Sequence, residues 1–403
     1  MNKNNGPLTG IRVFDLSRIL AGPAATQILG DYGADIIKIE KPGAGDDTRG
    51  WGPPYMKGKD GGDTGESAYY LSANRNKRSL TLDFTTPEGL ALAKKLLSSS
   101  DILFENFKTG TLDKYGLGYE QLKKEFPRLI YCSLTGFGHT GPYKDRAGYD
   151  YIIQGMGGFM SLTGPAEGEP HKAGVAIVDL MAGMYALSAI LAALYHREKT
   201  GEGQFIDISL LDTQVAWLSN AAQYYLTSGQ VPPRMGNAHL TIVPYETFEA
   251  ADGHIVLAVG NDRQYRDFCA VAGIAEDARF ATNRQRVENR SILVPLIRAA
   301  IAKKPRQFWI DEMEKCGVPC GPVNDMAQVF AHPQVTARDM TVTLPHPQAA
   351  KDITLIANPV KFSSTPVTHR TAPPTLGADT QEVLREAGLQ EAEIAALAEK
   401  GVI

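Results

Sequence analysis

A strand, a helix and a second strand follow one another at the start of the chain, and this pattern constrains the fold more than any other feature. Residues 11–15 (IRVFD) and 35–40 (DIIKIE) are apolar runs typical of short buried strands. Between them, Pro23 stands where a helix can begin and Gly33 where it can end. Two strands joined in this way are expected to be parallel, with a right-handed crossover.

The alternation of strands and helices continues to the region of residue 140. Strand-like runs occur at 79–84, 102–107 and 129–137, and helical segments at 89–99 and 119–126. This pattern predicts an α/β domain with a doubly wound, Rossmann-like parallel sheet. Ligands of such sheets bind beside the carboxyl ends of the strands. The loops expected at that edge are Ser17–Pro23, Lys41–Gly50, Asn106–Gly110 and Thr135–Gly141.

A change of composition divides the second half of the chain. Residues 228–239 (SGQVPPRMGNAH) are rich in Pro and Gly. Beyond them, two strand-like runs flank the turn Ala251-Asp252-Gly253 and are followed by helical segments, which is typical of an α+β unit. The predicted organisation is a large α/β domain formed by residues 1–227 and 329–403, with a smaller α+β domain inserted at 228–328.

The charge balance excludes a general binder of polyanions. Lys and Arg number 41 and Asp and Glu number 45, so the formal net charge is −4. No basic field is therefore expected to attract nucleic acid or an anionic membrane surface. An anionic ligand must be held by a local cluster of cations instead.

Three features of the sequence bear on the cellular compartment of the protein: its apolar stretches, its N-terminus and its cysteines. The apolar, uncharged stretch Leu180–Tyr195 has 16 residues, fewer than a transmembrane helix needs, so we expect a buried helix there. The N-terminus, MNKNNGPLTG, has no apolar signal core. Cys316 and Cys320 have neither a second cysteine pair nor a histidine at zinc-ligand spacing. Reduced thiols and a cytoplasmic protein are expected.

Several common site types find little support in the sequence. Gly136, Gly138 and Gly141 match G-x-G-x-x-G, but Pro142 follows and no helix opens there, so a nicotinamide-dinucleotide site is disfavoured. The histidines show no metal-ligand spacing, and we predict no metal site. The G-x-S-x-G elbow of serine hydrolases is also missing from the sequence.

Asp179 allows two interpretations. It lies between an apolar run and the long apolar helix expected at 179–197, where an aspartate often caps a helix N-terminus. A carboxylate at a helix start can also act as a nucleophile toward an activated acyl group, with backbone N–H groups stabilising the developing charge. Gly174 and Gly183 on either side would allow a ligand to approach closely.

Basic residues gather near the predicted strand ends. Each one alone is best explained as solvated surface, but together they would suit a phosphorylated cofactor. They are Arg18, Lys41, Arg49, Arg75, Lys77, Arg78, Lys108, Lys114 and Arg146.

Several motifs in one order resemble a known family. They are DLSRILAGPAATQILGDYGADIIKIEKP, NRNKRSLTLD, ENFKTGTLDKYGLGY, GYDYIIQGMGG, VDLMAGMYA and KTGEGQFIDISLLD. The chain resembles the class III (family III) CoA-transferases of the CaiB/BaiF type from about residue 8 to the C-terminus. The resemblance implies a large α/β domain that contains both termini, a small inserted domain, and an interlocked homodimer.

The resemblance also assigns roles to residues. The family's catalytic aspartate falls on Asp179, which would form an aspartyl-CoA thioester by double displacement, without ATP, a metal or a permanent cofactor. Coenzyme A would enter as an acyl-CoA substrate. The family's CoA contacts fall on Leu20, Ala21, Lys41, Leu82, Asp83, Asn106, Phe107, Thr111, Lys114, Tyr149 and Asp150.

Departures from individual family members bear on the substrate. Leu20 replaces a glutamine of formyl-CoA:oxalate transferase, Asp150 replaces its glutamate, and residues 235–239 (MGNAH) replace its run of glycines, which argues against oxalate and formate. Acyl-CoA racemases of the family, the alternative activity, use a G-H-D histidine where this chain has Tyr149.

The segments RMGNAH-x-x-IVPYETF and GNDRQY resemble transferases of short dicarboxylates such as succinate and glutarate. We therefore expect succinyl-CoA or a similar donor and a dicarboxylate acceptor such as glutarate. Arg234 or His239 is a candidate to hold the distal carboxylate. The alternative for Arg234 is an exposed arginine of a linker.

Overall fold

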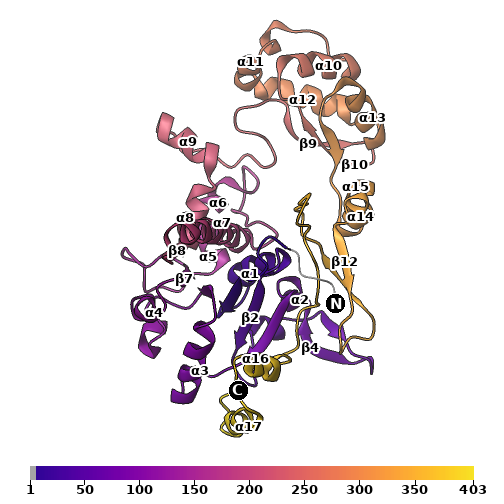
Figure 1. Cartoon of the computed structure of the whole chain (residues 1–403). Helices are drawn as coiled ribbons and strands as arrows, with labels where there is room; N and C mark the ends of the chain where they lie inside the picture. The colour runs from indigo at the N-terminus through magenta and orange to yellow at the C-terminus, as the bar shows by residue number, and fades with distance from the viewer. Residues whose placement is uncertain (1–5) are drawn as a thin grey trace. The chain divides into compact units, whose positions relative to one another are not determined.

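A parallel sheet of six strands forms the centre of the fold (Figure 1). The computed structural model describes residues 6–403. The strands, in the order β5-β2-β1-β6-β7-β8, pair in parallel throughout. Taken in chain order this is the 3-2-1-4-5-6 arrangement of doubly wound folds, so the predicted Rossmann-like α/β architecture is confirmed. The strands are β1 (Arg12–Asp15), β2 (Asp35–Glu40), β5 (Lys77–Thr81), β6 (Ile102–Glu105), β7 (Ile130–Thr135) and β8 (Phe205–Ser209).

Helices cover both faces of this sheet because successive strand residues point to opposite sides. Val13 and Ile36 belong to one buried cluster, whereas their neighbours Phe14 and Ile37 belong to another. The first cluster includes side chains of α1 (Ala21–Asp31), α7 (Ile177–Thr200) and α8 (Leu210–Ala216). The second includes side chains of α3 (Pro87–Leu97), α4 (Tyr119–Glu125), α16 (Thr380–Glu386) and α17 (Glu391–Glu399).

Some elements differ from the prediction. The sequence after the strand at 204–212 predicts one helix over 213–226, but the chain forms two helices there, α8 and α9 (Ser219–Ser228), because Ser219 adopts a left-handed conformation with φ 46°. A hairpin of β3 (Tyr55–Lys57) and β4 (Asp63–Ser67), followed by α2 (Ala68–Ser72), was not predicted. Its segment is exposed and rich in glycine, so it lacks the apolar periodicity that marks a strand.

The chain folds into two compact units. The first consists of Met1–Gly157, Ala173–Ser219 and Thr336–Ile403, and the second of Gly158–Lys172 and Asn220–Val335. The first unit also contains α5 (Asp150–Met156), the antiparallel pair β12 (Thr341–Leu344) and β13 (Ile353–Ile356), and two 3-10 turns, η1 (Asp47–Gly50) and η2 (Leu112–Tyr115).

The second unit has its own antiparallel sheet and its own core. The sheet order is β11-β10-β9, and Phe248, Ile255, Phe268 and Trp309 are buried together. Its strands are β9 (Tyr245–Ala250), β10 (Gly253–Ala258) and β11 (Cys320–Pro322). It contains α9 except for Ser219, and α15 (Pro333–Ala337) up to Val335. Its other helices are α6 (Phe159–Leu162), α10 (Asp262–Ala272), η3 (Ala278–Phe280), α11 (Asn283–Glu288), α12 (Arg290–Ile301), α13 (Arg306–Cys316) and α14 (Met326–Ala331).

Helix α7 is the longest of the described helices and lies beside α1 (Figure 1). Its 24 residues have a mean hydropathy of 2.0 over the most apolar window, so by length and composition alone it could cross a membrane. More than half of that window is buried inside the protein, which is how a core helix behaves. The sequence prediction of a buried apolar helix is thus consistent with its packing against α1.

Candidate active site

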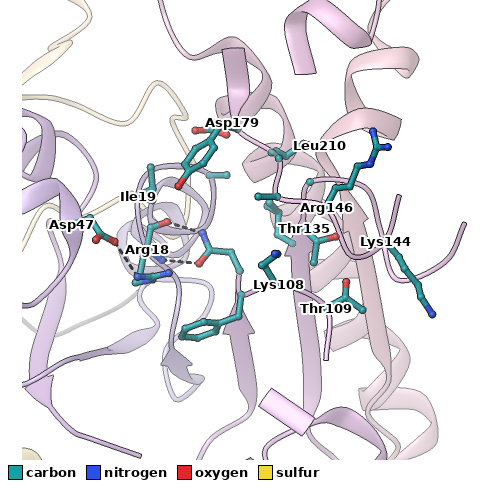
Figure 2. Close-up of a pocket in the computed structure, with 18 of the residues that line it drawn as sticks. Arg18, Ile19, Asp47, Lys108, Thr109, Thr135, Lys144, Arg146, Asp179 and Leu210 are labelled. Atoms are coloured by element: carbon teal, nitrogen blue, oxygen red, sulfur yellow. Dashed lines mark hydrogen bonds and ion pairs between the residues drawn. The ribbon is translucent and has the colours of Figure 1, made fainter. Parts of the chain in front are cut away.

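A cavity of about 400 Å³ opens at the carboxyl ends of the strands, where the strand order reverses between β1 and β6 (Figure 2). Doubly wound folds bind their ligands at this position. Asp179, the candidate nucleophile, lines it together with four residues expected to contact CoA: Ala21, Asn106, Phe107 and Tyr149.

A second cavity of about 460 Å³ lies beside the first. It is lined by the expected CoA contacts Lys41, Leu82 and Asp83, and again by Phe107. Because Arg18, Asp47 and Phe107 line both cavities, the two share one wall.

Asp179 is the third residue of α7, and its exposed fraction is only 9%. The N-cap of α7 is Ala176, so the interpretation of Asp179 as the capping residue is wrong. Asp150, at the start of α5, supplies the cap instead. Its Oδ1 accepts the backbone N–H of Val178 at 2.8 Å and that of Asp179 at 3.4 Å. The Asp179 side chain is therefore free to line the cavity.

The surroundings of Asp179 favour its neutral form. Burial and, to a smaller degree, the negative charge of Asp150 raise the pKa of Asp179 to about 7. Burial and the charges of Asp179 and Asp150 also raise the pKa of Tyr69 to about 12. The Tyr69 ring packs edge-on against Trp51, with centroids 5.2 Å apart, and Trp51 lines the cavity. Near neutral pH, Asp179 thus exists in both protonation states.

Gly183 brings α7 close to α1. A Cβ at this position would lie 2.6 Å from the carbonyl oxygen of Ala21, so only glycine permits the contact. We expected Gly183 to make room for a ligand, and this expectation is wrong because the space is taken by the first turn of α1. Gly174 has open space around its α-carbon. The close packing fixes Asp179, one turn before Gly183, beside Ala21.

Buried ionic contacts shape the loop between β1 and α1. The Lys38 ammonium donates to the Ser17 carbonyl at 2.9 Å and to Asp46 at 2.8 Å. Although burial opposes it, the ion pair with Lys38 lowers the pKa of Asp46 to about 2. Asp46 also accepts the backbone N–H of Ile19, which lines the cavity with φ 71°. A β-branched residue rarely adopts this conformation, so the loop is held in a strained shape beside the cavity.

Four of the basic residues near strand ends have structural partners. Arg49 pairs with Glu40 and Glu66 and packs on Tyr70. The other three pair as Arg75 with Asp31, Lys77 with Asp15, and Arg78 with Asp35 and Glu386. The expectation that these four residues help to hold a phosphorylated ligand is therefore wrong, because carboxylates of the protein already neutralise their charges.

The remaining basic residues are placed differently. Arg18 and Lys108 line the first cavity together with Lys144 and Arg146. Arg18 forms an ion pair with Asp47 at 3.0 Å. In Figure 2 the Lys108 side chain extends toward the middle of the lining residues, whereas Lys144 extends away from Asp179.

Four expected CoA contacts line neither cavity, namely Leu20, Thr111, Lys114 and Asp150. Leu20 is the N-cap residue of α1, and Thr111 and Lys114 lie at η2. Asp150 caps the helix that carries Asp179.

Arg234 and His239 belong to the second unit. The Arg234 guanidinium donates to the carbonyls of Pro165 at 3.2 Å and Gly168 at 2.7 Å. His239 Nδ1 accepts the backbone N–H of Thr241 at 3.1 Å. Both side chains thus have local partners within that unit.

The structure also adds residues that the sequence did not single out, namely Trp51, Thr135, Lys144 and Tyr69. Trp51 is exposed although it is large and aromatic, and it lines the first cavity. Among residues 6–403, no cluster of three or more His, Cys, Asp or Glu side chains could hold a metal ion.

Comparisons with known proteins agree with this geometry. The model of CoA-transferase family III matches residues 8–380. The succinate–glutarate CoA-transferase of Agrobacterium fabrum is 49% identical over 96% of this chain and 97% of its own length. The human succinyl-CoA:glutarate CoA-transferase is 42% identical over 95% of this chain and 86% of its own.

A solved structure is similar as well. The crystal structure of a CaiB/BaiF family protein from Brucella suis superposes with a TM-score of 0.84 at 47% identity, covering 95% of this chain and 100% of that one. A match over nearly the whole chain, together with a buried aspartate at the reversal point of the sheet, leads to one conclusion. This chain belongs to CoA-transferase family III.

Proposed function

We propose that this enzyme moves coenzyme A from succinyl-CoA, or a similar donor, to a short dicarboxylate such as glutarate, with Asp179 as the nucleophile. The observation that carries the proposal is the buried Asp179 carboxyl at the first turn of α7, facing a cavity whose wall contains expected CoA contacts. The printed names of the relatives from Agrobacterium fabrum and human support the choice of succinate and glutarate.

The two cavities suggest a path for acyl-CoA. Lys41 is exposed at the rim of the second cavity, where its charge would meet phosphate groups. Phe107 belongs to both cavities and would pack against the pantetheine arm as it passes between them. The thioester would then reach Asp179 in the first cavity.

The reaction would proceed by double displacement. The Asp179 carboxylate attacks the thioester carbonyl of the donor, forming a mixed anhydride and releasing CoA thiolate. The thiolate attacks the aspartyl carbonyl, which leaves an aspartyl-CoA thioester and the free donor acid. The acceptor carboxylate attacks that thioester and forms a second anhydride. CoA thiolate finally attacks the acceptor's carbonyl, giving the product thioester and restoring Asp179.

The local structure supports each step. The backbone N–H groups of Val178 and Asp179 are bound by Asp150, so the first turn of α7 would act on developing negative charge through the positive end of the helix dipole. Burial of Asp179 limits access of water, which would otherwise hydrolyse the anhydride or the thioester. The energy of the starting thioester is kept throughout, so the balanced reaction requires neither ATP nor a resident cofactor. Arg234 and His239 remain our candidates for the distal carboxylate of the acceptor.

We further propose a cytoplasmic homodimer in which two chains interlock and the residues around 228–328 form an inserted small domain. Large apolar side chains are exposed on α7 to α9, which supports association with a second copy. They include Met184, Tyr195, Trp217 and Leu226.

The test is a chemical trap. The enzyme is mixed with succinyl-CoA and then with hydroxylamine, and the peptide that contains Asp179 is weighed by mass spectrometry. We expect an aspartyl hydroxamate in the wild type and none in Asp179→Ala. The control Asp63→Ala, whose exposed side chain pairs with Lys57 at the surface, should behave as wild type.

Substrate choice is tested with a matrix of acyl-CoA donors and carboxylic acids read by mass. Transfer from succinyl-CoA to glutarate is expected to be among the fastest reactions. Normal turnover by Asp179→Ala would overturn the proposal. Deuterium uptake at the α-carbon without any acceptor acid would instead point to the racemase activity.

A further inference from the structure

Three side chains form a row across the last strands of the parallel sheet. Glu105 ends β6 and is in register with Ser133 of β7, and Ser133 is in register with Asp207 of β8. Register partners on neighbouring strands point to the same face, so the three side chains lie side by side. Glu105 and Ser133 are buried, whereas Asp207 is exposed.

His139 closes this row from the loop that follows β7. Its Nε2 lies 2.7 Å from the Ser133 hydroxyl, and its backbone N–H donates to Asp207 at 3.0 Å. Its ring stands edge-on to Phe205, with centroids 5.0 Å apart. The Ser133 hydroxyl also acts on Glu105, because it lowers the pKa of that carboxyl group against the effect of burial.

Glu105 also holds the backbone of Phe107, a residue that lines the first cavity. Its Oε2 accepts the backbone N–H of Phe107 at 2.7 Å and so closes the turn that leaves β6. Within this turn the Asn106 amide accepts the backbone N–H of Arg18 at 2.9 Å and donates to its carbonyl at 2.7 Å. The turn therefore joins the loops that follow β1 and β6, and Phe107 forms the wall shared by both cavities.

We propose that Glu105 is a positioning residue for acyl-CoA. Ser133 and His139 hold the Glu105 side chain in place on the sheet. Glu105 in turn holds the turn of Asn106 and Phe107, along which CoA would lie. The proposal rests on the proposed function, because it takes the two cavities as the CoA site. No role in bond making is assigned to Glu105, which would act only by holding Phe107 and Asn106 in place.

The charge of Glu105 should matter to this role. Burial raises the pKa of Glu105 to about 7, against the opposing effect of the Ser133 hydroxyl and the Phe107 N–H. A carboxylate accepts both hydrogen bonds more strongly than a protonated carboxyl group does. The turn is thus held most firmly above pH 7. The ionisable groups that share a small cavity with Glu105 are Lys108, Asp113, Tyr119, Glu120, Tyr131 and His139, and Asp207 contacts the backbone of His139.

The test measures CoA binding apart from catalysis. Asp179→Asn serves as the parent protein, because it removes the titration of Asp179, and Glu105→Gln is added to it. The dissociation constant of free CoA is measured by calorimetry from pH 6 to pH 8.5. Comparing the two proteins at each pH cancels the ionisation of CoA's own phosphate.

We expect the Glu105→Gln protein to bind CoA about 5- to 30-fold more weakly at pH 8, where the parent holds a carboxylate worth roughly 1–2 kcal/mol more as an acceptor. At pH 6 the two constants should approach one another. Glu120→Gln, in the same cavity but exposed, is the matched control and should leave binding unchanged. Thermal unfolding of each variant checks that it is folded.

Three outcomes are distinguishable. Equal constants for parent and Glu105→Gln at pH 8 would overturn the positioning role, and so would a loss of the same size at pH 6 and pH 8. Ser133→Ala gives a second check, since it should reduce the pH dependence in the same direction. Failure of the parent protein to bind CoA at any pH would instead count against the proposed function.

Discussion

Asp150 Oδ1 accepts the backbone N–H of Asp179 at 3.4 Å, and its negative charge adds to the effect of burial in raising the pKa of Asp179. Asp150 thus caps the helix that carries the proposed nucleophile and also adds, after burial, to the raised pKa of that nucleophile. The two roles are separable, because an asparagine keeps an acceptor oxygen but loses the charge.

Asp150→Asn should shift the pH dependence of transfer. Since the attacking form of Asp179 is the carboxylate, kcat/KM of the wild type is expected to rise with pH through about 7. Without the charge of Asp150, that rise should move to lower pH. The variant should therefore keep a larger share of its maximal kcat/KM at pH 6 than the wild type does. The measurement is kcat/KM for succinyl-CoA from pH 5 to pH 9. An unchanged midpoint would show that the charge of Asp150 does not reach Asp179.

Asp150→Ala provides the matching control for the cap. It removes both the charge and the acceptor, so it should cost about 1 kcal/mol of unfolding free energy, as lost N-caps do. Asp150→Asn should retain most of that stability in urea unfolding.

Asp179→Asn should change how stability depends on pH. The folded-state pKa of Asp179, about 7, lies above its ordinary value of 3.8. Below pH 3.8 both the folded and the unfolded chain are protonated there. As the pH rises toward 7 the unfolded chain releases this proton first, so the wild type loses stability across that interval.

The asparagine variant lacks this loss because it cannot ionise. Its midpoint of thermal unfolding relative to wild type should therefore rise between pH 4 and pH 7 and stay level above that. The gain is expected to be on the order of 1–4 kcal/mol at pH 8. A difference between the two proteins that stays constant with pH would refute the raised pKa.

Gly183→Ala should separate α7 from α1. The new Cβ would lie 2.6 Å from the Ala21 carbonyl oxygen, which belongs to backbone and cannot rotate away. Overpacking of this kind costs about 1–3 kcal/mol, and the shift of α7 should also displace Asp179 and lower kcat. Urea unfolding and steady-state transfer measure the two effects. A Cβ at Gly174 would meet open space, so Gly174→Ala should change neither the unfolding free energy nor kcat. If the two variants lose stability and activity equally, the close contact of Gly183 with Ala21 is not the cause.

The sequence predicted the elements that carry local signals. The strands at 12–15 and 35–40 and the helix between them have apolar runs bounded by Pro23 and Gly33, and the structure has them within two residues. The break at Ser219 was missed because a left-handed serine leaves no compositional mark.

Residue roles that depend on distant partners were harder to predict. Arg75 and Arg78 have their partners at Asp31 and Glu386, so their charges looked available for a ligand until the fold was known. Asp150 and Val178 are likewise 28 residues apart, and the capping bond between them is invisible in the local sequence. The choice of Asp179 came from the family resemblance, and local pattern alone left the capping interpretation equally open.

Lys41 and Arg49 offer a last contrast between a binding cation and a structural one. Lys41 is exposed at the second cavity, so Lys41→Ala should raise KM for acyl-CoA about 3- to 10-fold, as loss of one exposed charge pair does, without changing stability. Arg49→Met should instead leave Glu40 and Glu66 buried without their cation, which costs about 3–5 kcal/mol of unfolding free energy. For each of the two variants, urea unfolding measures the free energy of unfolding and acyl-CoA saturation curves measure KM. An unchanged KM in Lys41→Ala would place the phosphates of CoA away from the second cavity, and the proposed path from Lys41 past Phe107 to Asp179 would have to be abandoned.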